Sequence, residues 1–112
     1  GYTCEEDIRK IAENYRKNKL PLDMVYLDID YMEKFKDFTV NKKSFPDFKN
    51  FVSDMKKNSV RIVPIIDAGI KMEDGFELYE EGKENNYFCK DKDGNDFIVE
   101  CLLKRNFLLS RC

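Results

Sequence analysis

Two stretches in the first half of the chain have apolar residues at the three- and four-residue spacing of a helix face. In residues 3–17 this apolar stripe consists of Ile8, Ile11, Ala12 and Tyr15. Thr3 and Glu6 have the spacing of a capping box, in which a hydroxyl and a carboxylate bind first-turn amides, so the helix is expected to begin at Thr3. In residues 44–57 the start signals Ser44, Pro46 and Asp47 precede a second stripe of Phe48, Phe51, Val52 and Met55.

Two other runs are almost continuously apolar and end abruptly at an acidic residue. They cover residues 24–30 and 60–67, and such runs are typical of parallel strands that are buried on both faces. The order helix, strand, helix, strand therefore predicts α/β architecture, with a crossover between two parallel strands.

Asp28, Asp30 and Asp67 fall at the carboxyl ends of these predicted strands. Ligand sites of α/β sheets and barrels collect at that edge. Asp28 and Asp30 point the same way if the strand is still regular there, and they could then share a ligand. Each aspartate could equally cap a neighbouring helix or pair with a basic side chain of a loop.

The patterns in the second half are weaker. A short helix is expected near residues 76–82, and a hairpin with an Asp-Gly turn is expected over residues 87–99. Residues 101–112 differ in composition from the rest, since they hold three basic residues, four leucines and a phenylalanine but no acidic residue.

Length, charge and residue content exclude several functional classes. The 112 residues suffice for one modest core, and 20 basic against 22 acidic residues are too balanced for a protein that binds nucleic acid through its charge. Because histidine is absent, Ser-His-Asp and Cys-His catalysis, His-ligated zinc and haem with a proximal histidine are excluded. No apolar run has the length of a membrane span, so no membrane partner is expected.

Cysteine usage predicts reduced thiols in a cytoplasmic protein. Cys4, Cys89, Cys101 and Cys112 form no C-x-x-C pair, and they are too sparse for a disulfide-stapled fold. The chain shows no apolar signal segment, which also favours the cytoplasm. We expect no metal and no cofactor.

The string from Leu27 to Asp30, an apolar residue followed by Asp-x-Asp, suits aspartyl-phosphate chemistry. In that chemistry the first aspartate attacks phosphorus, the second donates a proton, and Mg²⁺ bridges them. The string resembles the first motif of haloacid dehalogenase-type phosphatases, although Tyr31 stands where that family usually has Thr or Val. A phosphatase that releases phosphate with Mg²⁺ is therefore an alternative function.

A longer set of motifs is similar, in order and spacing, to the catalytic barrel of glycoside hydrolase family 31, the α-glucosidase family. The matching blocks are residues 22–32, 36–39, 45–47, 65–71, 75–82 and 86–88. Several collinear blocks are more specific than one Asp-x-Asp string, and the resemblance covers roughly residues 1–100.

The resemblance implies a partial (β/α)8 (TIM) barrel, with its second and third strands, the flanking helices and a C-terminal hairpin or tail. Asp28 resembles the aspartate at the bottom of the family's -1 sugar subsite, where a carboxylate accepts hydrogen bonds from glucose hydroxyls. Ile29 and Ile65 resemble the apolar walls of that pocket, and Asp30 and Asp67 match motif positions with a supporting role.

The resemblance further implies that the catalytic residues lie elsewhere. A retaining glycosidase needs a carboxylate nucleophile and an acid/base, and in this family both are aspartates of later barrel strands. The parent enzyme would hydrolyse terminal α-linked glucose from α-glucoside oligosaccharides, whereas the 112-residue chain is expected to be inactive by itself. After Glu100 the sequence departs from the family, so residues 101–112 are interpreted as a non-native tail that follows the barrel part, residues 1–100.

Two strands without their barrel neighbours leave hydrogen-bonding edges and an apolar face uncovered. We therefore expect a homodimer or higher oligomer, held together through these edges and the tail. A non-catalytic, oligomerising interaction domain with residues 101–112 as its docking segment is the second class of function.

Overall fold

The chain folds into two compact units, Gly1–Ile66 and Asp67–Cys112. The computed structural model of the protein describes residues 1–67, 69–101 and 105–108. Within these ranges, every helix is too short or too polar to cross a bilayer. The boundary between the units follows Ile66 and not residue 100, where the composition changes, and the division into a barrel part and a non-native tail stays a prediction.

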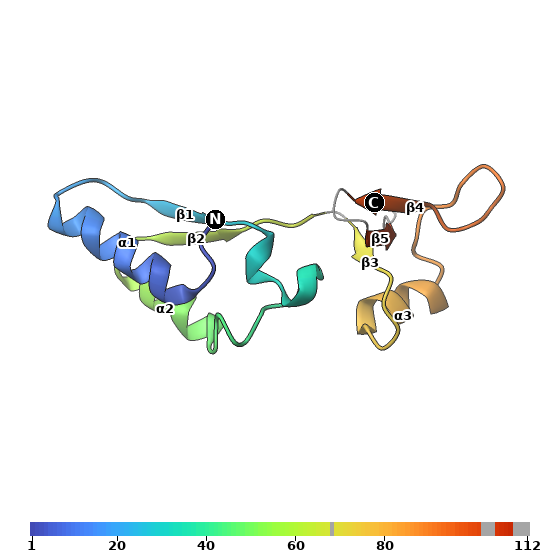
Figure 1. Cartoon of the computed structure of the whole chain (residues 1–112), viewed down its shortest axis with the longest axis horizontal. Helices are drawn as coiled ribbons and strands as arrows, with labels where there is room; N and C mark the ends of the chain where they lie inside the picture. Colours follow the sequence, from blue (N-terminus) through green and yellow to red (C-terminus); the bar gives the residue numbers. More distant parts are fainter. Residues whose placement is uncertain (68, 102–104, 109–112) are drawn as a thin grey trace. The chain divides into compact units, whose positions relative to one another are not determined.

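The first unit alternates helices and strands as the apolar pattern predicted (Figure 1). Its elements are α1 (Glu5–Lys17), β1 (Met24–Leu27), the 3-10 turns η1 (Ile29–Tyr31) and η2 (Glu33–Phe35), α2 (Phe48–Lys57) and β2 (Arg61–Pro64). β1 and β2 pair in parallel, with Val25 opposite Ile62 and Leu27 opposite Pro64. The predicted parallel crossover is thereby confirmed.

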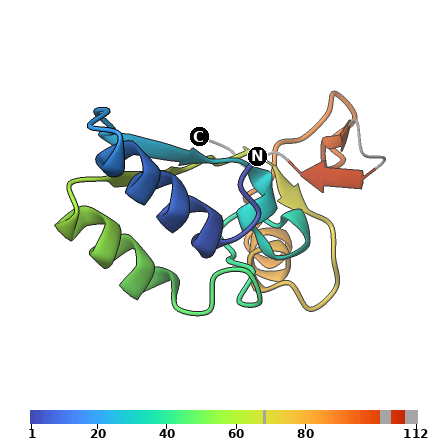
Figure 2. The same ribbon diagram turned by 60° about the vertical axis from the view of Figure 1, so that its left-hand side comes forward.

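Both helices lie on the same face of the two-stranded sheet, as Figures 1 and 2 show from two directions. The core between the helices and the sheet is formed by Ile8, Ala12, Val25, Leu27, Tyr31, Met32, Phe45, Phe51, Met55 and Val60. On the opposite face, Met24 is 43% exposed and Tyr26 is 67% exposed, because side chains alternate along the strand. We call this second face the open face of the sheet.

The two helices begin differently. At α2 the prediction is confirmed, because the Asp47 side chain accepts a hydrogen bond of 3.0 Å from the Asn50 amide. At α1 the predicted capping box is wrong. The N-cap residue is Cys4, which places Thr3 outside the helix, and the Thr3 hydroxyl donates to Asp7 Oδ2 at 3.3 Å instead of binding an amide.

The predicted strand over residues 24–30 is too long. β1 ends at Leu27, and the chain then enters the 3-10 turn η1, whose N-cap is Asp28. An aspartate side chain that binds a nearby backbone amide stabilises a turn at the expense of a strand ladder. The second strand also ends before the predicted end at Asp67, since β2 stops at Pro64, although the Ile65 amide still donates to the Leu27 carbonyl at 2.9 Å.

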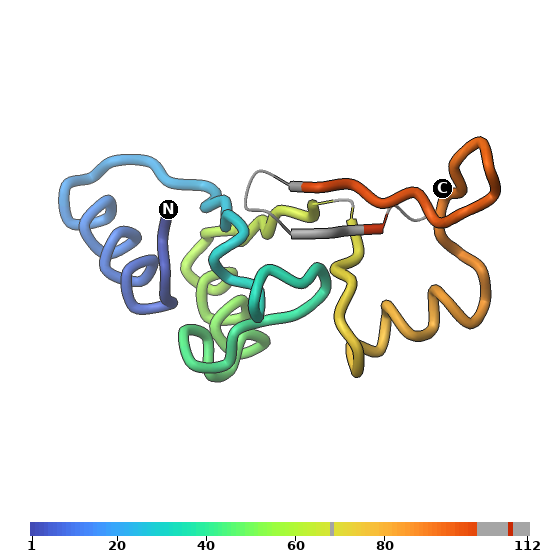
Figure 3. The backbone as a smooth tube through the Cα atoms, turned by 45° about the vertical axis from the view of Figure 1, so that its right-hand side comes forward, coloured from blue at the N-terminus to red at the C-terminus, as the bar shows by residue number. Residues whose placement is uncertain are grey.

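The second unit contains β3 (Ile70–Lys71), α3 (Glu77–Glu84), β4 (Ile98–Cys101) and β5 (Arg105–Leu108). The sheet has the antiparallel order β3-β5-β4. In Figure 3 the backbone of this unit runs from the yellow β3 through the golden α3 to the orange-red β4. Its core consists of Ile70, Phe76, Tyr79, Phe88 and Leu108. The predicted short helix is confirmed.

The predicted hairpin over residues 87–99 is only partly correct. Its Asp-Gly turn is present, since Gly94 has φ 85° and the Asp91 amide donates to the Asn95 carbonyl at 2.8 Å. Across this turn Lys90 and Asp96 form a bridge, and the Phe97 amide donates to the Cys89 carbonyl at 2.8 Å. From Ile98 onward the chain forms β4 and pairs with β5.

Candidate functional site at the carboxyl ends of the two parallel strands

A hollow of about 520 Å³ lies at the carboxyl ends of β1 and β2. It is lined by Gly1, Tyr2, Tyr26, Leu27, Asp28, Val63 and Ile65, and we call it the strand-end hollow. Of the five residues that the sequence predicted for the sugar site, Asp28 and Ile65 line this hollow together. An acidic group and an apolar wall therefore meet in one concave surface.

Asp28 is exposed and continues the extended backbone of β1 for one residue, with φ -81° and ψ 178°. Side-chain alternation places it on the open face of the sheet with Tyr26. Its Oδ1 accepts a hydrogen bond of 2.8 Å from the Ile29 amide. A carboxylate has about four lone-pair sites on its two oxygens, so this bond orients the group and leaves it able to accept from ligand hydroxyls.

Ile65 is held by backbone hydrogen bonds on both sides although its side chain is 45% exposed. Its amide donates to the Leu27 carbonyl at 2.9 Å, and its carbonyl accepts from the Tyr31 hydroxyl at 2.8 Å. The apolar wall of the hollow is therefore tied both to β1 and to the turn that follows β1.

The other three predicted residues do not line the strand-end hollow. Ile29 is half-buried and packs against the core of the first unit. Asp30 belongs to η1, so strand alternation does not align it with Asp28, although a Cβ placed on Gly1 would lie 3.5 Å from Asp28 Cβ and 3.7 Å from Asp30 Oδ2. Asp67 is the exposed first residue of the second unit. The roles of these residues in sugar binding stay predictions.

The sequence patterns assigned no role to Tyr31 or Asp37, although both are buried and Tyr31 binds the carbonyl of Ile65 in the strand-end hollow's apolar wall. Tyr31 is 5% exposed and Asp37 is 2% exposed. Burial raises the pKa of the Tyr31 hydroxyl above its ordinary value of 10.0, and the negative charge of Asp37 raises this pKa further. The hydroxyl therefore keeps its proton at neutral pH and remains a donor to the Ile65 carbonyl.

This raised pKa gives a pH-dependent stability that is specific to Tyr31. A group with a raised pKa in the folded state stabilises the fold fully below its unfolded pKa and loses that contribution as the pH rises through the folded pKa. We expect the stability advantage of the wild type over Tyr31→Phe, measured by urea unfolding, to shrink as the pH rises above the ordinary tyrosine pKa of about 10. The pKa of Lys10 is also raised, by the hydrogen bond and the charge of Glu6. Lys10 is present in both proteins, so its contribution drops out of the difference in their free energies of unfolding. A difference that stays constant with pH would contradict the prediction.

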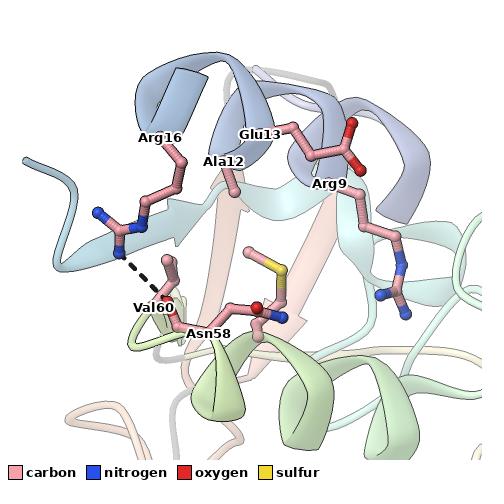
Figure 4. A pocket seen from close by; sticks show the side chains of 7 residues that line it. Arg9, Ala12, Glu13, Arg16, Asn58 and Val60 are labelled. Atoms are coloured by element: carbon pink, nitrogen blue, oxygen red, sulfur yellow. Dashed lines mark hydrogen bonds between the residues drawn. The ribbon is translucent and has the colours of Figure 1, made fainter. Parts of the chain in front are cut away.

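A second hollow of about 360 Å³ lies between α1 and α2 (Figure 4). It is lined by Arg9, Ala12, Glu13, Arg16, Met55, Asn58 and Val60. Arg16 donates to the Asn58 carbonyl at 3.2 Å and to the Leu22 carbonyl at 3.1 Å, so its guanidinium ties the end of α2 to the segment before β1. This hollow lies near the amino end of β2, whereas active sites of barrels lie at the carboxyl ends of the strands.

The comparison with protein-family models matches residues 1–107 to the model described as Glycosyl hydrolases family 31 TIM-barrel domain. The chain belongs to glycoside hydrolase family 31. A family 31 relative, alpha-glucosidase 2 of Bacillus thermoamyloliquefaciens, is 38% identical over 100 residues, which cover 89% of this chain and 13% of that protein. Glucoamylase 1 of Candida albicans is 36% identical over 107 residues, which cover 88% of this chain and 11% of that protein.

Solved family 31 structures agree with the fold of this chain. The DNJ-bound glucosidase II alpha subunit has a TM-score of 0.89 and 28% identity, over 97% of this chain and 12% of that one. The family 31 alpha-glucosidase of Bacteroides thetaiotaomicron has a TM-score of 0.81 and 29% identity, over 97% of this chain and 19% of that one.

The family and the fold class predicted from the sequence are therefore confirmed. The two parallel strands with flanking helices correspond to part of a family 31 barrel, and the barrel is not closed within the described residues. The chain spans 13% of the length of the Bacillus relative and 11% of the length of the Candida relative.

Proposed function

We propose that the chain supplies part of the -1 sugar subsite of a retaining α-glucosidase, which hydrolyses terminal α-linked glucose from oligosaccharides. The observation that carries this proposal is the meeting of Asp28 and Ile65 in the strand-end hollow, on the open face of the sheet. In a closed barrel, the helices cover the outer face of the strands and the opposite face is the interior, whose carboxyl-end mouth holds the active site. Family 31 relatives named as α-glucosidases support the same substrate class.

The hollow suits one end of a pyranose ring. A sugar presents hydroxyls around its edge and C–H groups on its faces, so a subsite needs both hydrogen-bond acceptors and an apolar surface. The Asp28 carboxylate, oriented by the Ile29 amide, accepts from neighbouring hydroxyls, and the exposed side chain of Ile65 contacts the C–H groups. The wall role of Ile29 and the supporting roles of Asp30 and Asp67 stay predictions from the family motifs.

The hydrolytic step itself is assigned to other residues. Retaining hydrolysis requires a nucleophile and an acid/base whose carboxyl groups lie about 5 Å apart on either side of the scissile bond. We infer that both come from other strands of a complete family 31 barrel. The chain by itself is therefore expected to bind sugar weakly and to hydrolyse no aryl α-glucoside.

Asp28→Asn tests the function in an enzyme that holds these residues together with the rest of a family 31 barrel. The substitution keeps the shape of the side chain but removes the negative charge and one acceptor oxygen. A hydrogen bond to a charged group contributes about 1.5–3 kcal/mol, so we expect kcat/KM for an aryl α-glucoside to fall by roughly 100-fold.

Asp93→Asn is the matched control, because Asp93 is exposed in the turn before β4 and lies outside the strand-end hollow. It should leave kcat/KM unchanged. Full activity of Asp28→Asn would overturn the proposed function. Phosphate release that needs Mg²⁺ and is lost on Asp28→Asn would favour the phosphatase instead.

We further propose that the 112-residue chain self-associates through β1 and the open face of the sheet. In the described part of the chain, β1 has only β2 as a strand partner, and an unpaired strand edge is a template for another copy. Tyr26 on this face is 67% exposed. An exposed edge beside exposed apolar side chains favours burial against a second molecule.

Sedimentation velocity over a concentration series tests the self-association. We expect dimers or larger species for the wild type and a shift toward monomer for Tyr26→Lys, because a charged side chain on the open face resists burial. Tyr15→Lys is the control, since Tyr15 is also exposed but belongs to α1. A folded wild-type monomer at high concentration would refute the self-association.

A further inference from the structure

The side chain of Tyr31 connects the turn after β1 to the end of β2. Its hydroxyl donates a hydrogen bond of 2.8 Å to the carbonyl of Ile65, which lies 34 positions later in the sequence. Its ring stacks on Phe48 with a centroid distance of 6.2 Å and an interplanar angle of 16°. Its backbone carbonyl accepts from the Asn41 amide at 2.8 Å. Tyr31 is therefore held at its hydroxyl, at its ring and at its backbone.

Tyr31 and Asp28 stand at the two ends of one turn. Asp28 is the N-cap of η1, Tyr31 is the last residue of η1, and the Tyr31 amide donates to the Asp28 carbonyl at 3.3 Å. The same turn that orients the Asp28 carboxylate through the Ile29 amide thus carries the hydroxyl that binds Ile65. Movement of this turn would change the position of both lining residues.

The surroundings of the hydroxyl favour a fixed bond. Tyr31 is 5% exposed, and the nearby carboxylate of Asp37 is 2% exposed, so water has little access with which to replace the Ile65 carbonyl as acceptor. Hydrogen bonds in such a buried polar environment are stronger than in water. The bond therefore acts as a clamp between the two strand ends, and it lies outside the lining of the strand-end hollow.

We propose that Tyr31 is a positioning residue for sugar binding, whose hydroxyl clamps the Ile65 carbonyl and thereby fixes the apolar wall beside the Asp28 carboxylate. This inference rests on the proposed function of the strand-end hollow. The clamp sets the separation between the surface that receives the C–H groups of the sugar and the carboxylate that receives its hydroxyls. Tyr31 does not touch the sugar and acts only through Ile65 and η1.

Tyr31→Phe tests the clamp in the same barrel-containing enzyme, because it removes one oxygen atom and retains the ring that stacks on Phe48. A misplaced wall weakens binding of substrate and transition state alike. We therefore expect KM for an aryl α-glucoside to rise about five- to tenfold with kcat within about twofold, which corresponds to the loss of one hydrogen bond. Tyr79→Phe is the matched control, since Tyr79 is 6% exposed and belongs to α3. Its KM should stay at the wild-type value.

Ile65→Val provides a second measurement that keeps the clamp and trims the wall. It should also raise KM, and the double variant with Tyr31→Phe should raise KM by less than the product of the two single effects, because both changes act on the same wall. A Tyr31→Phe enzyme with lower thermal stability but unchanged KM, or two fully multiplicative effects, would overturn the proposal. If the proposed function of the strand-end hollow is itself wrong, Asp28→Asn leaves kcat/KM intact whatever Tyr31→Phe does. That result is distinct from a failure of the Tyr31 proposal alone.

Discussion

Replacing Phe51 by alanine is expected to unfold the first unit at temperatures at which the wild-type unit is folded. Phe51 is 0% exposed and lies 5.7 Å from the ring of Phe45 and 6.1 Å from the ring of Phe48, between centroids. The guanidinium of Arg9 lies over the Phe51 ring at 5.3 Å. Removing a fully buried phenyl group costs about 3–5 kcal/mol, because burial is lost and a cavity remains.

A cost of this size is comparable to the whole stability of a small unit with one modest core. Thermal unfolding followed by circular dichroism, with amide hydrogen exchange of α1 and α2 as a local readout, measures the effect. Phe38→Ala is the matched control, since Phe38 is 65% exposed and its loss should change the free energy of unfolding by less than about 0.5 kcal/mol. Equal stability losses for the two variants would show that the core of the first unit is not centred on Phe51.

Gly82→Leu is expected to disrupt the second unit. Gly82 is buried in α3, and a Cβ at this position would lie 2.3 Å from Cζ and 2.7 Å from Cε2 of Phe88. The Phe88 ring is 2% exposed and stacks on Tyr79 at 6.3 Å, so it has no free volume to enter. Glycine is therefore required here for the close approach of the ring to the helix backbone. We expect a loss of about 3 kcal/mol in the free energy of unfolding of this unit.

The control for this prediction is Glu81→Leu, which adds the same side chain at the adjacent, exposed position of α3. It should change the stability by less than about 0.5 kcal/mol. Hydrogen exchange of the α3 and β5 amides separates the second unit from the first. If the clash with the ring is the cause, Phe88→Leu should relieve part of the smaller loss caused by Gly82→Ala. Additive losses in that pair of variants would contradict the assignment.

The types of the main elements of the first unit could be predicted from local patterns, but their ends were less certain. The helical stripes and the two apolar runs are dictated by side-chain period, which survives in the sequence whatever the rest of the chain does. The start of α2 was predicted correctly, because Asp47 caps the helix locally. The predicted start of α1 was wrong by one residue, because Cys4 and not Thr3 is the N-cap. The predicted first strand was too long, because Asp28 binds the Ile29 amide and starts a turn. A side chain that satisfies a backbone amide competes with the ladder in a way that hydrophobicity does not record.

The candidate site was also only partly predictable from the sequence. The acidic ends of the apolar runs and the family motifs pointed to Asp28 and Ile65, and the structure brings these two residues into one hollow. The motifs also drew attention to the block 36–39 but assigned nothing to Asp37, whose burial cannot be read from local spacing. Tyr26 as a lining residue follows from strand alternation backward from Asp28, a signal that was present but not used.

The family, the α/β order and the acidic ends of the two strands could be read from the amino-acid sequence, because they depend on residue type, period and motif spacing along the chain. The hydrogen bond from the Tyr31 hydroxyl to the Ile65 carbonyl, 34 positions away, became visible only in the folded chain. The same is true of the close approach of Gly82 to the Phe88 ring. Such contacts form between segments that share no local pattern, and their geometry is fixed only when the helices pack on the sheets and close-packing selects one arrangement.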